Sequence, residues 1–216
     1  MPAATARRAV RRARPRRRVR LDNDARRAQL LALARKAFAD NSYDDCSIDD
    51  LAHEAKISKG LLYHYFPTKR DLYVAALREI ADELVARVIA ISVDLPPAER
   101  VRGGLDAYLG YLEHHARAFV ALMRGGIGSD PEVAAIVEGV RKRLSDLLLE
   151  GSPFAKLLGD SPRFTVAARG WIGFVEQVSI DWCADPRMSR GELIELLSQI
   201  LFAIISTVAP QILRGA

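Results

Sequence analysis

Residues 47–69 read SIDDLAHEAKISKGLLYHYFPTK, and this stretch decides how the rest of the chain is interpreted. Apolar residues recur at helical spacing in two short runs, residues 48–55 and 62–66, with a tight turn between them. Ser47 and Ser58 each stand just before a run, where N-capping side chains belong. Two short helices joined by a tight turn predict a helix-turn-helix, in which the second helix is the recognition helix.

The second helix offers more polar groups than a purely structural surface needs. Leu62 and Phe66 lie four residues apart and are expected to face the core. The alternative is that the Tyr63–His64–Tyr65 run is ordinary packing, and of these three we expect Tyr65 to turn inward. The other side would present a cation, a residue without a side chain and several hydrogen-bonding groups to the major groove. We therefore expect contacts with double-stranded DNA from Ser47, Ser58, Lys59, Gly60, Leu61, Tyr63, His64 and Lys69.

Each polar position has a physical use on a duplex. The helix N-terminus at Ser58 points free N–H groups toward phosphate or base edges. Gly60 would let the backbone approach a base pair, and Lys59 could donate to guanine acceptors. Tyr63 and His64 could bind phosphate oxygens and fix the register, as could Ser47 and Lys69 at the starts of their helices.

The flanking segments complete a three-helix unit over residues 25–70. A first helix over residues 25–39 has Leu30, Leu33, Ala34, Ala37 and Phe38 on one face, with Asp24 as its expected cap. Thr68 starts a fourth helix that runs to about residue 91. Apolar periodicity then predicts further helices near residues 101–112, 132–150, 162–184 and 190–207. The chain is therefore expected to be all-α, with a larger helical domain over residues 71–216.

Residues 1–24 form a basic N-terminal arm that we expect to be disordered when free. Nine arginines and no acidic residue lie within residues 1–20, so the remainder carries 23 basic against 27 acidic residues. This asymmetry favours a polyanionic partner, and we expect Arg16, Arg17 and Arg18 to contact DNA. The alternative is a solubilising tail. An organellar transit peptide is disfavoured because Pro15 and the dense arginines spoil an amphipathic helix.

The N-terminal third resembles the TetR family of bacterial regulators. The departures are Lys56 and Ser42, at turn positions where the family usually has glycine. The matching residues are the helix over 26–38, Tyr43, Ser47, Ile48, Leu51, Ala52, Ala55, and the run Ile57, Ser58, Lys59, Gly60, Leu62, Tyr63, His64, Tyr65, Phe66, Pro67, Lys69 and Leu72.

The resemblance implies a homodimer that binds a palindromic operator, with one recognition helix in each major groove. The last two helices would pair with those of the second copy in a four-helix bundle. Residues 193–205 are apolar on more than one face, which agrees with a dimer interface, the alternative being a central core helix. Repression is the family's usual mode, with activation, or DNA binding without an effector, as the alternatives.

The resemblance also implies a pocket for a small lipophilic effector, such as an acyl chain, an aromatic drug or a sterol-like compound. The alternative for each candidate is plain core packing, and the fourth helix is expected to transmit the change because it joins the two domains. Trp182, Glu176 and His115 are further candidates. The main lining candidates are Tyr108, Tyr111, Phe119, Met123, Trp171, Phe174 and Gln177.

Other functional classes find little support in the sequence. No catalytic motif is present, and none of the four histidines has the Glu three residues earlier that a di-iron bundle needs, so we expect no enzyme, cofactor or metal site. No uninterrupted apolar run spans a bilayer, which favours a cytoplasmic protein without membrane contact. A basic adaptor on anionic lipid is the remaining alternative. Cys46 and Cys183 are expected to be reduced thiols.

Overall fold

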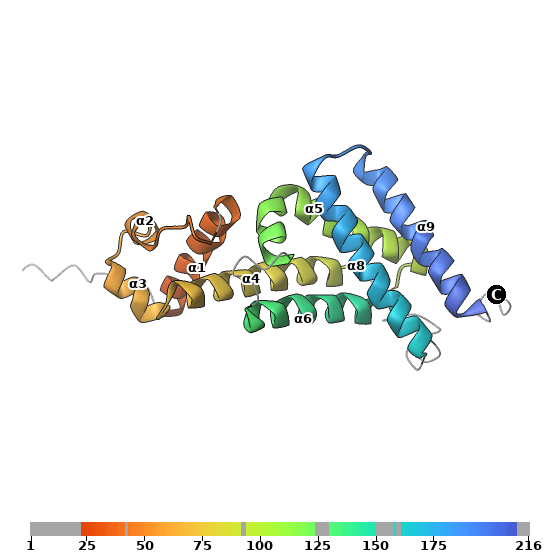
Figure 1. Ribbon diagram of the computed structural model, residues 1–216, viewed down its shortest axis with the longest axis horizontal. Coiled ribbons are helices and arrows are strands. Elements are labelled where there is room, and N and C mark those ends of the chain that lie inside the picture. Colours follow the sequence, from red (N-terminus) through yellow and green to blue (C-terminus); the bar gives the residue numbers. More distant parts are fainter. Residues whose placement is uncertain are drawn as a thin grey trace, which may run out of the picture.

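The computed structural model describes residues 23–41, 43–91, 94–123, 130–149, 158 and 161–210. Within these ranges the chain forms eight helices and no strand, so the all-α prediction is confirmed. Figure 1 shows an elongated molecule with a small unit at one end and a larger helical bundle at the other. The arm over residues 1–20, with Arg16, Arg17 and Arg18, lies outside the described residues.

The small unit contains three helices and the start of a fourth. These are α1 (Asn23–Asp40), α2 (Ile48–Glu54), α3 (Lys59–Tyr65) and α4 (Lys69–Ile89). α4 is the longest of them and leaves the unit to enter the larger bundle (Figure 1). Because one continuous helix belongs to both units, a movement of its first turn is tied to the packing further along it.

Short polar side chains start the helices at the predicted positions. The Oγ atoms of Ser47 and Ser58 each accept the backbone N–H three residues later, at 3.2 Å. Thr68 and Asp71 form a reciprocal capping box at the start of α4. The expectation for Asp24 needs a correction: α1 already includes Asn23, so Asp24 lies in the first turn and favours the helix through its charge.

An aromatic cluster joins α1 to α4. The ring of Tyr73 on α4 meets Phe38 edge-on at 4.9 Å between ring centroids and Tyr43 at 5.0 Å. Phe38 and Tyr73 are both buried, and Leu30 and Ala34 extend the same buried face of α1. Edge-to-face pairs add to the free energy of apolar burial, so α1 is held firmly on α4. The core of the unit therefore forms without the outer side of α3.

The turn between α2 and α3 contains a residue with left-handed backbone. Lys56 has φ 55°, and it is the sole non-glycine residue with positive φ in the described part of the chain. Its backbone N–H donates to the carbonyl of His53 at 3.0 Å. A side chain in this conformation costs about 1–2 kcal/mol relative to glycine. Lys56, which stands where the resemblance implies glycine, therefore accepts this strained turn.

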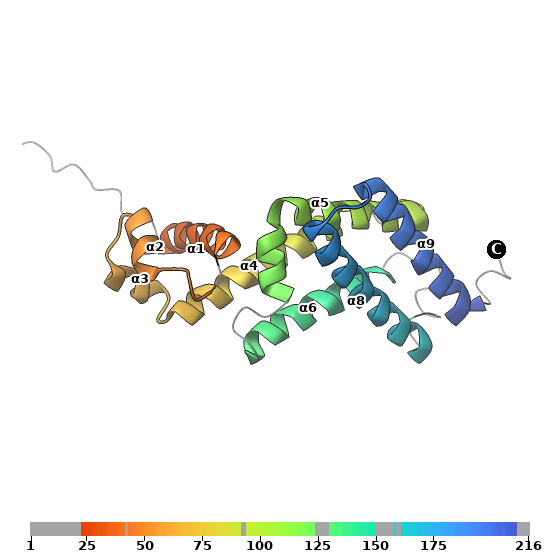
Figure 2. The ribbon, with the colours of Figure 1, turned by 45° about the horizontal axis from the view of Figure 1, so that its top comes forward.

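The larger unit contains α5 (Pro97–Met123), α6 (Pro131–Leu147), α8 (Pro162–Ala184) and α9 (Arg190–Val208). α4 packs on α5 and α6, while α5, α8 and α9 pack on one another, as Figures 1 and 2 show from two directions. α5 is kinked at His115, where φ is −134° and ψ 23°. The kink lets the second half of α5 turn toward the small unit, where it packs on α1.

α9 has the length and composition of a membrane-spanning helix, with a mean hydropathy of 1.6, which the sequence reading did not detect. Within one chain only 22% of its most apolar window is buried. Its polar side chains nevertheless attach it to α5, because Arg190 pairs with Asp106 and Glu113, and Glu195 pairs with Arg102. The exposed apolar area fits a helix that packs against protein on both sides.

Candidate nucleic-acid interface and ligand cavity

α3 turns only a small part of its surface toward the core. Leu62 is buried, and so is Phe66 directly after the helix. Tyr65 is half-buried and its hydroxyl donates to Oδ1 of Asn23 at 3.2 Å, so it turns inward as the sequence analysis expected. The opposite side of the helix is left for solvent or a partner, and it carries Gly60, Leu61, Tyr63 and His64.

Two exposed residues of α3 are unusual for a helix surface. Leu61 is 38% exposed and Tyr63 is 36% exposed, although each carries a large apolar surface. Gly60 lies in a helix, yet a Cβ placed on it would meet no atom within 4 Å. Packing within the chain therefore does not require glycine there, and glycine in a helix costs about 1 kcal/mol relative to alanine.

The two lysines of the motif are already engaged within the chain. Nζ of Lys59 lies 2.9 Å from a carboxylate oxygen of Asp49 on α2, and this hydrogen bond raises the pKa of the lysine. Nζ of Lys69 donates to the backbone carbonyl of Asp44 at 3.2 Å and lies over the Tyr43 ring. Lys59 is exposed and can exchange its carboxylate for a phosphate, whereas Lys69 also holds the loop before α2 against α4.

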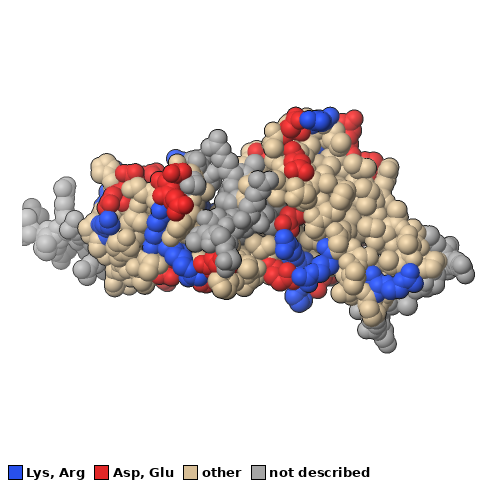
Figure 3. All heavy atoms as spheres, viewed as in Figure 1, with Lys and Arg blue, Asp and Glu red and all other residues tan. Residues whose placement is uncertain are grey.

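Figure 3 shows acidic and basic groups close together on the small unit, in keeping with the Lys59–Asp49 pair. Ser47 is half-buried and its hydroxyl is committed to capping α2. The face of the small unit that Figure 3 shows therefore carries charges of both signs.

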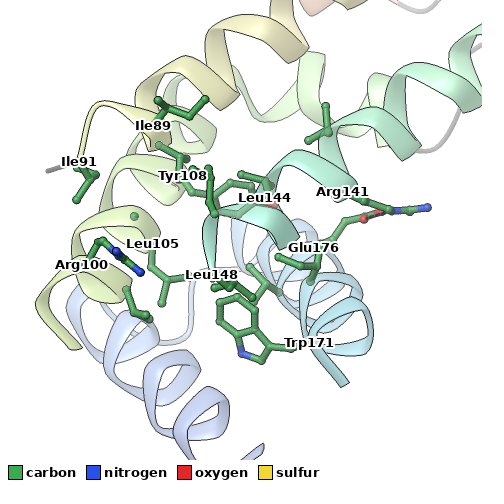
Figure 4. A pocket seen from close by; sticks show the side chains of 17 residues that line it. Ile89, Ile91, Arg100, Leu105, Tyr108, Arg141, Leu144, Leu148, Trp171 and Glu176 are labelled. Carbon is green, nitrogen blue, oxygen red and sulfur yellow. Dashed lines mark hydrogen bonds and ion pairs between the residues drawn. The ribbon is translucent and has the colours of Figure 1, made fainter. Parts of the chain in front are cut away.

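A cavity of about 140 Å³ lies in the larger unit, between α4, α5, α6 and α8 (Figure 4). Its wall is mainly apolar, with Tyr108 and Trp171 as the aromatic residues. The indole N–H of Trp171 donates to the carbonyl of Leu197 on α9 at 3.2 Å, which fixes the ring. The aliphatic lining residues are Val88, Ile89, Ile91, Val101, Leu105, Val140, Leu144, Leu147, Leu148, Ile172 and Val175.

Not all predicted lining residues reach this cavity. Tyr111 is buried elsewhere, stacked on His115 with its hydroxyl donating to the carbonyl of Ile80. Phe174 is 41% exposed and Gln177 is exposed, because neither lies among the buried residues of α8. The side chains of Phe119 and Met123 lie outside the described part of the structure.

The charged residues of the cavity wall were only partly foreseen. Glu176, a predicted polar anchor, lines the cavity, and its two carboxylate oxygens accept from Nε and Nη2 of Arg141 at 2.9 and 2.7 Å. Arg141 and Arg100 were not predicted to line it. A single arginine in an amphipathic helix looks like a surface residue in the sequence, and only the packing of the helices shows that it borders a cavity.

An ion-pair network connects α4 with the start of α6. Arg70, in the first turn of α4, binds both carboxylate oxygens of Asp130 at 2.6 and 2.8 Å. Asp130 is only 7% exposed and also caps α6 by accepting the N–H groups of Glu132 and Val133. Arg70 holds the pKa of Asp130 down to about 2. Arg78 adds a second contact to Glu132 at 2.9 Å.

The geometry therefore combines a helix-turn-helix with an exposed second helix and a helical bundle with an apolar cavity. A sequence profile for bacterial regulatory proteins of the tetR family matches residues 30–76, and one for the tetracyclin repressor-like C-terminal domain matches residues 97–204. The chain belongs to the TetR family of bacterial transcriptional regulators. TetR-family proteins are regulators and not enzymes.

Individual TetR-family relatives agree with this assignment. A crystal structure of a tetR-family transcriptional regulator from Streptomyces coelicolor matches with a TM-score of 0.77 and 32% identity, over 88% of this chain and 85% of that one. The transcriptional activator FasR of Mycolicibacterium smegmatis is 32% identical over 132 residues, which is 61% of this chain and 60% of FasR. The transcriptional repressor KstR2 of Mycobacterium tuberculosis is 37% identical over 94 residues, 43% of this chain and 46% of KstR2.

The TetR-family assignment also gives context to two negative findings. Among the described residues, no group of three or more His, Cys, Asp or Glu side chains could hold a metal ion. Cys46 is buried and Cys183 is half-buried, and both are free thiols.

Proposed function

We propose that the chain is a ligand-responsive transcriptional repressor that binds a palindromic operator as a homodimer and is released by a small lipophilic effector. The observation that supports DNA binding is the outer side of α3, where Gly60, Leu61, Tyr63 and His64 are all exposed. Hydrogen-bonding and apolar side chains on one exposed helix match what a major groove offers. On DNA binding, Lys59 would exchange its ion pair with Asp49 for a contact with a phosphate or a guanine base.

Selection of bound duplexes from a random pool tests the DNA-binding proposal most directly. We expect a palindromic consensus whose half-sites are about one helical turn apart or a multiple of it. An enriched but asymmetric consensus would contradict the dimer, and no enrichment would contradict sequence-specific binding. Anionic vesicles in the same binding assay test the alternative of a basic adaptor on lipid. That alternative requires the protein to bind the vesicles more tightly than duplex DNA.

The outer faces of α8 and α9 support the homodimer. Val166 is 73% exposed, and Phe174 and Leu196 are each 41% exposed. Gly170 and Gly173 lie on the same side of α8, with open space where a Cβ would be. Figure 3 shows a broad surface over α8 and α9 with few charged groups between its ends. A patch of this kind, with small residues that allow helices to approach closely, fits a second copy of the same face.

Sedimentation of charge variants tests the dimer. Val166→Asp should convert the protein to monomers, because an unpaired carboxylate would be buried in the interface. Leu95→Asp is the matched control, since Leu95 is 39% exposed but lies before α5, away from this face. A wild-type monomer at micromolar concentration, or an unchanged Val166→Asp dimer, would contradict this interface.

The cavity and the Arg70–Asp130 contact support control by a ligand. The last turns of α6 line the cavity, and the start of α6 holds the first turn of α4, directly after α3. A ligand that prefers one position of α6 would change the population of DNA-binding arrangements. Thermal-shift screening with fatty acids, aromatic compounds and sterols should find compounds that raise the melting temperature and release DNA. A panel that does neither would contradict the effector part of the proposal.

The Arg-rich arm is proposed to follow the DNA backbone beside the recognition helix. Twenty extended residues reach about 65 Å. Each neutralised phosphate contributes about 0.9 to the slope of log affinity against log salt. Removal of residues 1–20 should therefore flatten that slope and weaken binding with little change in consensus. An unchanged slope would show that the arm does not contact DNA.

The sign of regulation needs its own experiment, because the relatives include both an activator and a repressor. Transcription from a template that carries the selected operator at a promoter should fall when the protein is added and recover with the effector. A rise on addition of the protein would make it an activator.

A further inference from the structure

The polar groups around the cavity differ in whether they already have partners. Arg141 and Glu176 satisfy each other through two hydrogen bonds. The indole N–H of Trp171 is bound to a carbonyl, and the hydroxyl of Tyr108 is hydrogen-bonded to Ser179. These four side chains therefore present satisfied groups or ring faces to the cavity, and none of them calls for a polar ligand atom.

Arg100 is the exception on the wall of the cavity. It lies in the first turn of α5, is half-buried and borders the cavity together with Leu105. In Figure 4 its side chain extends toward the cavity and not away from it. No described residue forms an ion pair or side-chain hydrogen bond with its guanidinium, whereas Arg102, two residues later, pairs with Glu195 at 3.1 Å.

The charge on the cavity wall is consequently unbalanced. Of the three charged lining residues, Arg100 and Arg141 are positive and Glu176 is negative, which leaves a net charge of +1. An unpaired cation beside apolar surface gains most from an anion that arrives together with apolar groups. The guanidinium also has a planar fork of donors that matches the oxygens of a carboxylate or phosphate.

We propose that the cavity binds an anionic amphiphile, with its hydrocarbon part inside and its carboxylate or phosphate on Arg100. The inference rests on the proposed function, because it names the chemical class of the effector for the same cavity. It adds a specificity-determining residue at the mouth, where a neutral analogue would leave the cation unpaired and a cationic analogue would be repelled.

The volume of the cavity limits the hydrocarbon part. An engineered apolar cavity of about 150 Å³ holds a benzene molecule, and this one measures about 140 Å³. The enclosed part of the ligand is therefore compact, and a longer chain has to continue out past the mouth. A short straight chain is the appropriate probe, because much of it can enter the cavity while its head group stays at the mouth beside Arg100.

Calorimetric titration of the full chain with four probes that share one hydrocarbon tests the proposal. The probes are octanoate, octyl phosphate, octanol and octylamine, used below their micelle-forming concentrations. We expect at least one anionic probe to bind roughly ten- to a hundredfold more tightly than octanol, the range for a hydrogen-bonded charge, and octylamine to bind most weakly. Comparison of octanoate with octyl phosphate identifies the preferred head group.

Two variants assign the preference to a residue. Arg100→Gln should reduce the affinity of the anionic probe to that of octanol, while Arg100→Lys should retain part of the difference. Arg102→Gln is the matched control, because it removes the same charge from the same helix outside the cavity and should leave the preference unchanged. Thermal unfolding of each variant checks that it folds. If Arg100→Gln does not fold, the anion site is tested by the ranking of the four probes with the wild type and by their affinities for Arg100→Lys.

The outcomes separate this inference from the proposed function. If octanol binds as tightly as both anions, or if Arg100→Gln keeps the preference, the anion site is refuted while the apolar effector cavity remains. If none of the four probes binds, the anionic-amphiphile inference fails. In that case the screen of larger lipophilic compounds decides separately whether the cavity serves an effector at all.

Discussion

The helix-turn-helix and the cavity unit use opposite sides of their helices. In α3 only Leu62 is buried, and the residues that we assign to DNA are those that packing leaves outside. In α8 eight residues are buried, and the cavity is lined by the side that faces the core. A function on the outside is visible in a sequence, because exposed Gly, Leu and Tyr conflict with what a surface helix needs. A function on the inside is hidden, because the lining of a cavity has the same composition as a core.

The two regions also differ in how they can be altered. Exposed residues of α3 can be replaced with little effect on folding, so their variants report on DNA alone. Apolar residues of the cavity support the bundle, so a useful variant among them must add volume and not remove it. Substitutions chosen on this basis should separate the two activities completely.

The largest effect should follow from Lys59→Ala combined with Tyr63→Ala. We expect operator affinity to fall roughly a hundredfold or more, since each good contact in the groove contributes substantially to discrimination. Fluorescence anisotropy with the selected duplex measures this fall. Lys142→Ala is the control, because Lys142 also pairs with an aspartate, at 2.6 Å, but lies on α6. Unchanged affinity in the double variant would mean that α3 is not the recognition helix.

The corresponding variant in the cavity is Gly104→Leu, which is expected to have the second-largest effect. Gly104 lines the cavity, and a Cβ there would meet Val88 at an ordinary 3.6 Å, so the larger side chain should fill the space. We expect release of DNA by an effector to require at least about ten times more ligand, with operator affinity unchanged. Gly139→Leu on α6 is the control, with the same gain in helix propensity and open space around it. Equal effector responses in both variants would argue against this cavity.

A third test concerns the contact between the two units. Arg70→Gln should lower the melting temperature at pH 7, because Asp130 loses its bidentate partner. The pKa of Asp130 is lowered from 3.8 to about 2, so this stabilisation is present above about pH 4 and is lost as the pH falls through 2. The difference between wild type and variant should therefore shrink between pH 4 and pH 2. Arg78→Gln, which loses only a contact to Glu132 and leaves the Arg70–Asp130 pair intact, is the matched control and should lower the melting temperature at pH 7 by less.

The smallest effect is expected in the turn before α3. Lys56→Gly should stabilise the folded state by about 1 kcal/mol, because glycine adopts φ 55° without steric cost. Denaturant unfolding measures this gain, and Lys56→Ala, which keeps a Cβ, should not show it. If Lys56→Gly also weakens DNA binding at low salt, the lysine contacts the duplex in addition to forming the turn.

The helix starts could be predicted from the sequence because they depend on neighbours within a few residues. The inward turn of Tyr65 was also predicted, but its partner Asn23, 42 residues away, was not. The partners of Lys59 and Arg70 could not, since Asp49 lies across a turn and Asp130 lies 60 residues away. Phe174 was expected in the cavity beside Trp171, but α8 is apolar on two faces and periodicity alone does not say which one is inside. Arg100 was missed because its single charge looked like solvent-exposed surface.

The 17 residues of α6 form a rod about 25 Å long, with the cavity at one end and Arg70 at the other. If a guest tilts this rod by about 5° around its cavity end, the far end moves by about 2 Å. In a symmetric dimer both recognition helices would move, so their separation could change by about 4 Å. One helical turn of DNA, which sets the spacing of successive major grooves, is about 34 Å. A small tilt at the cavity, amplified along the stiff helix α6, would thus be enough to bring the recognition helices out of register with the two half-sites of the operator.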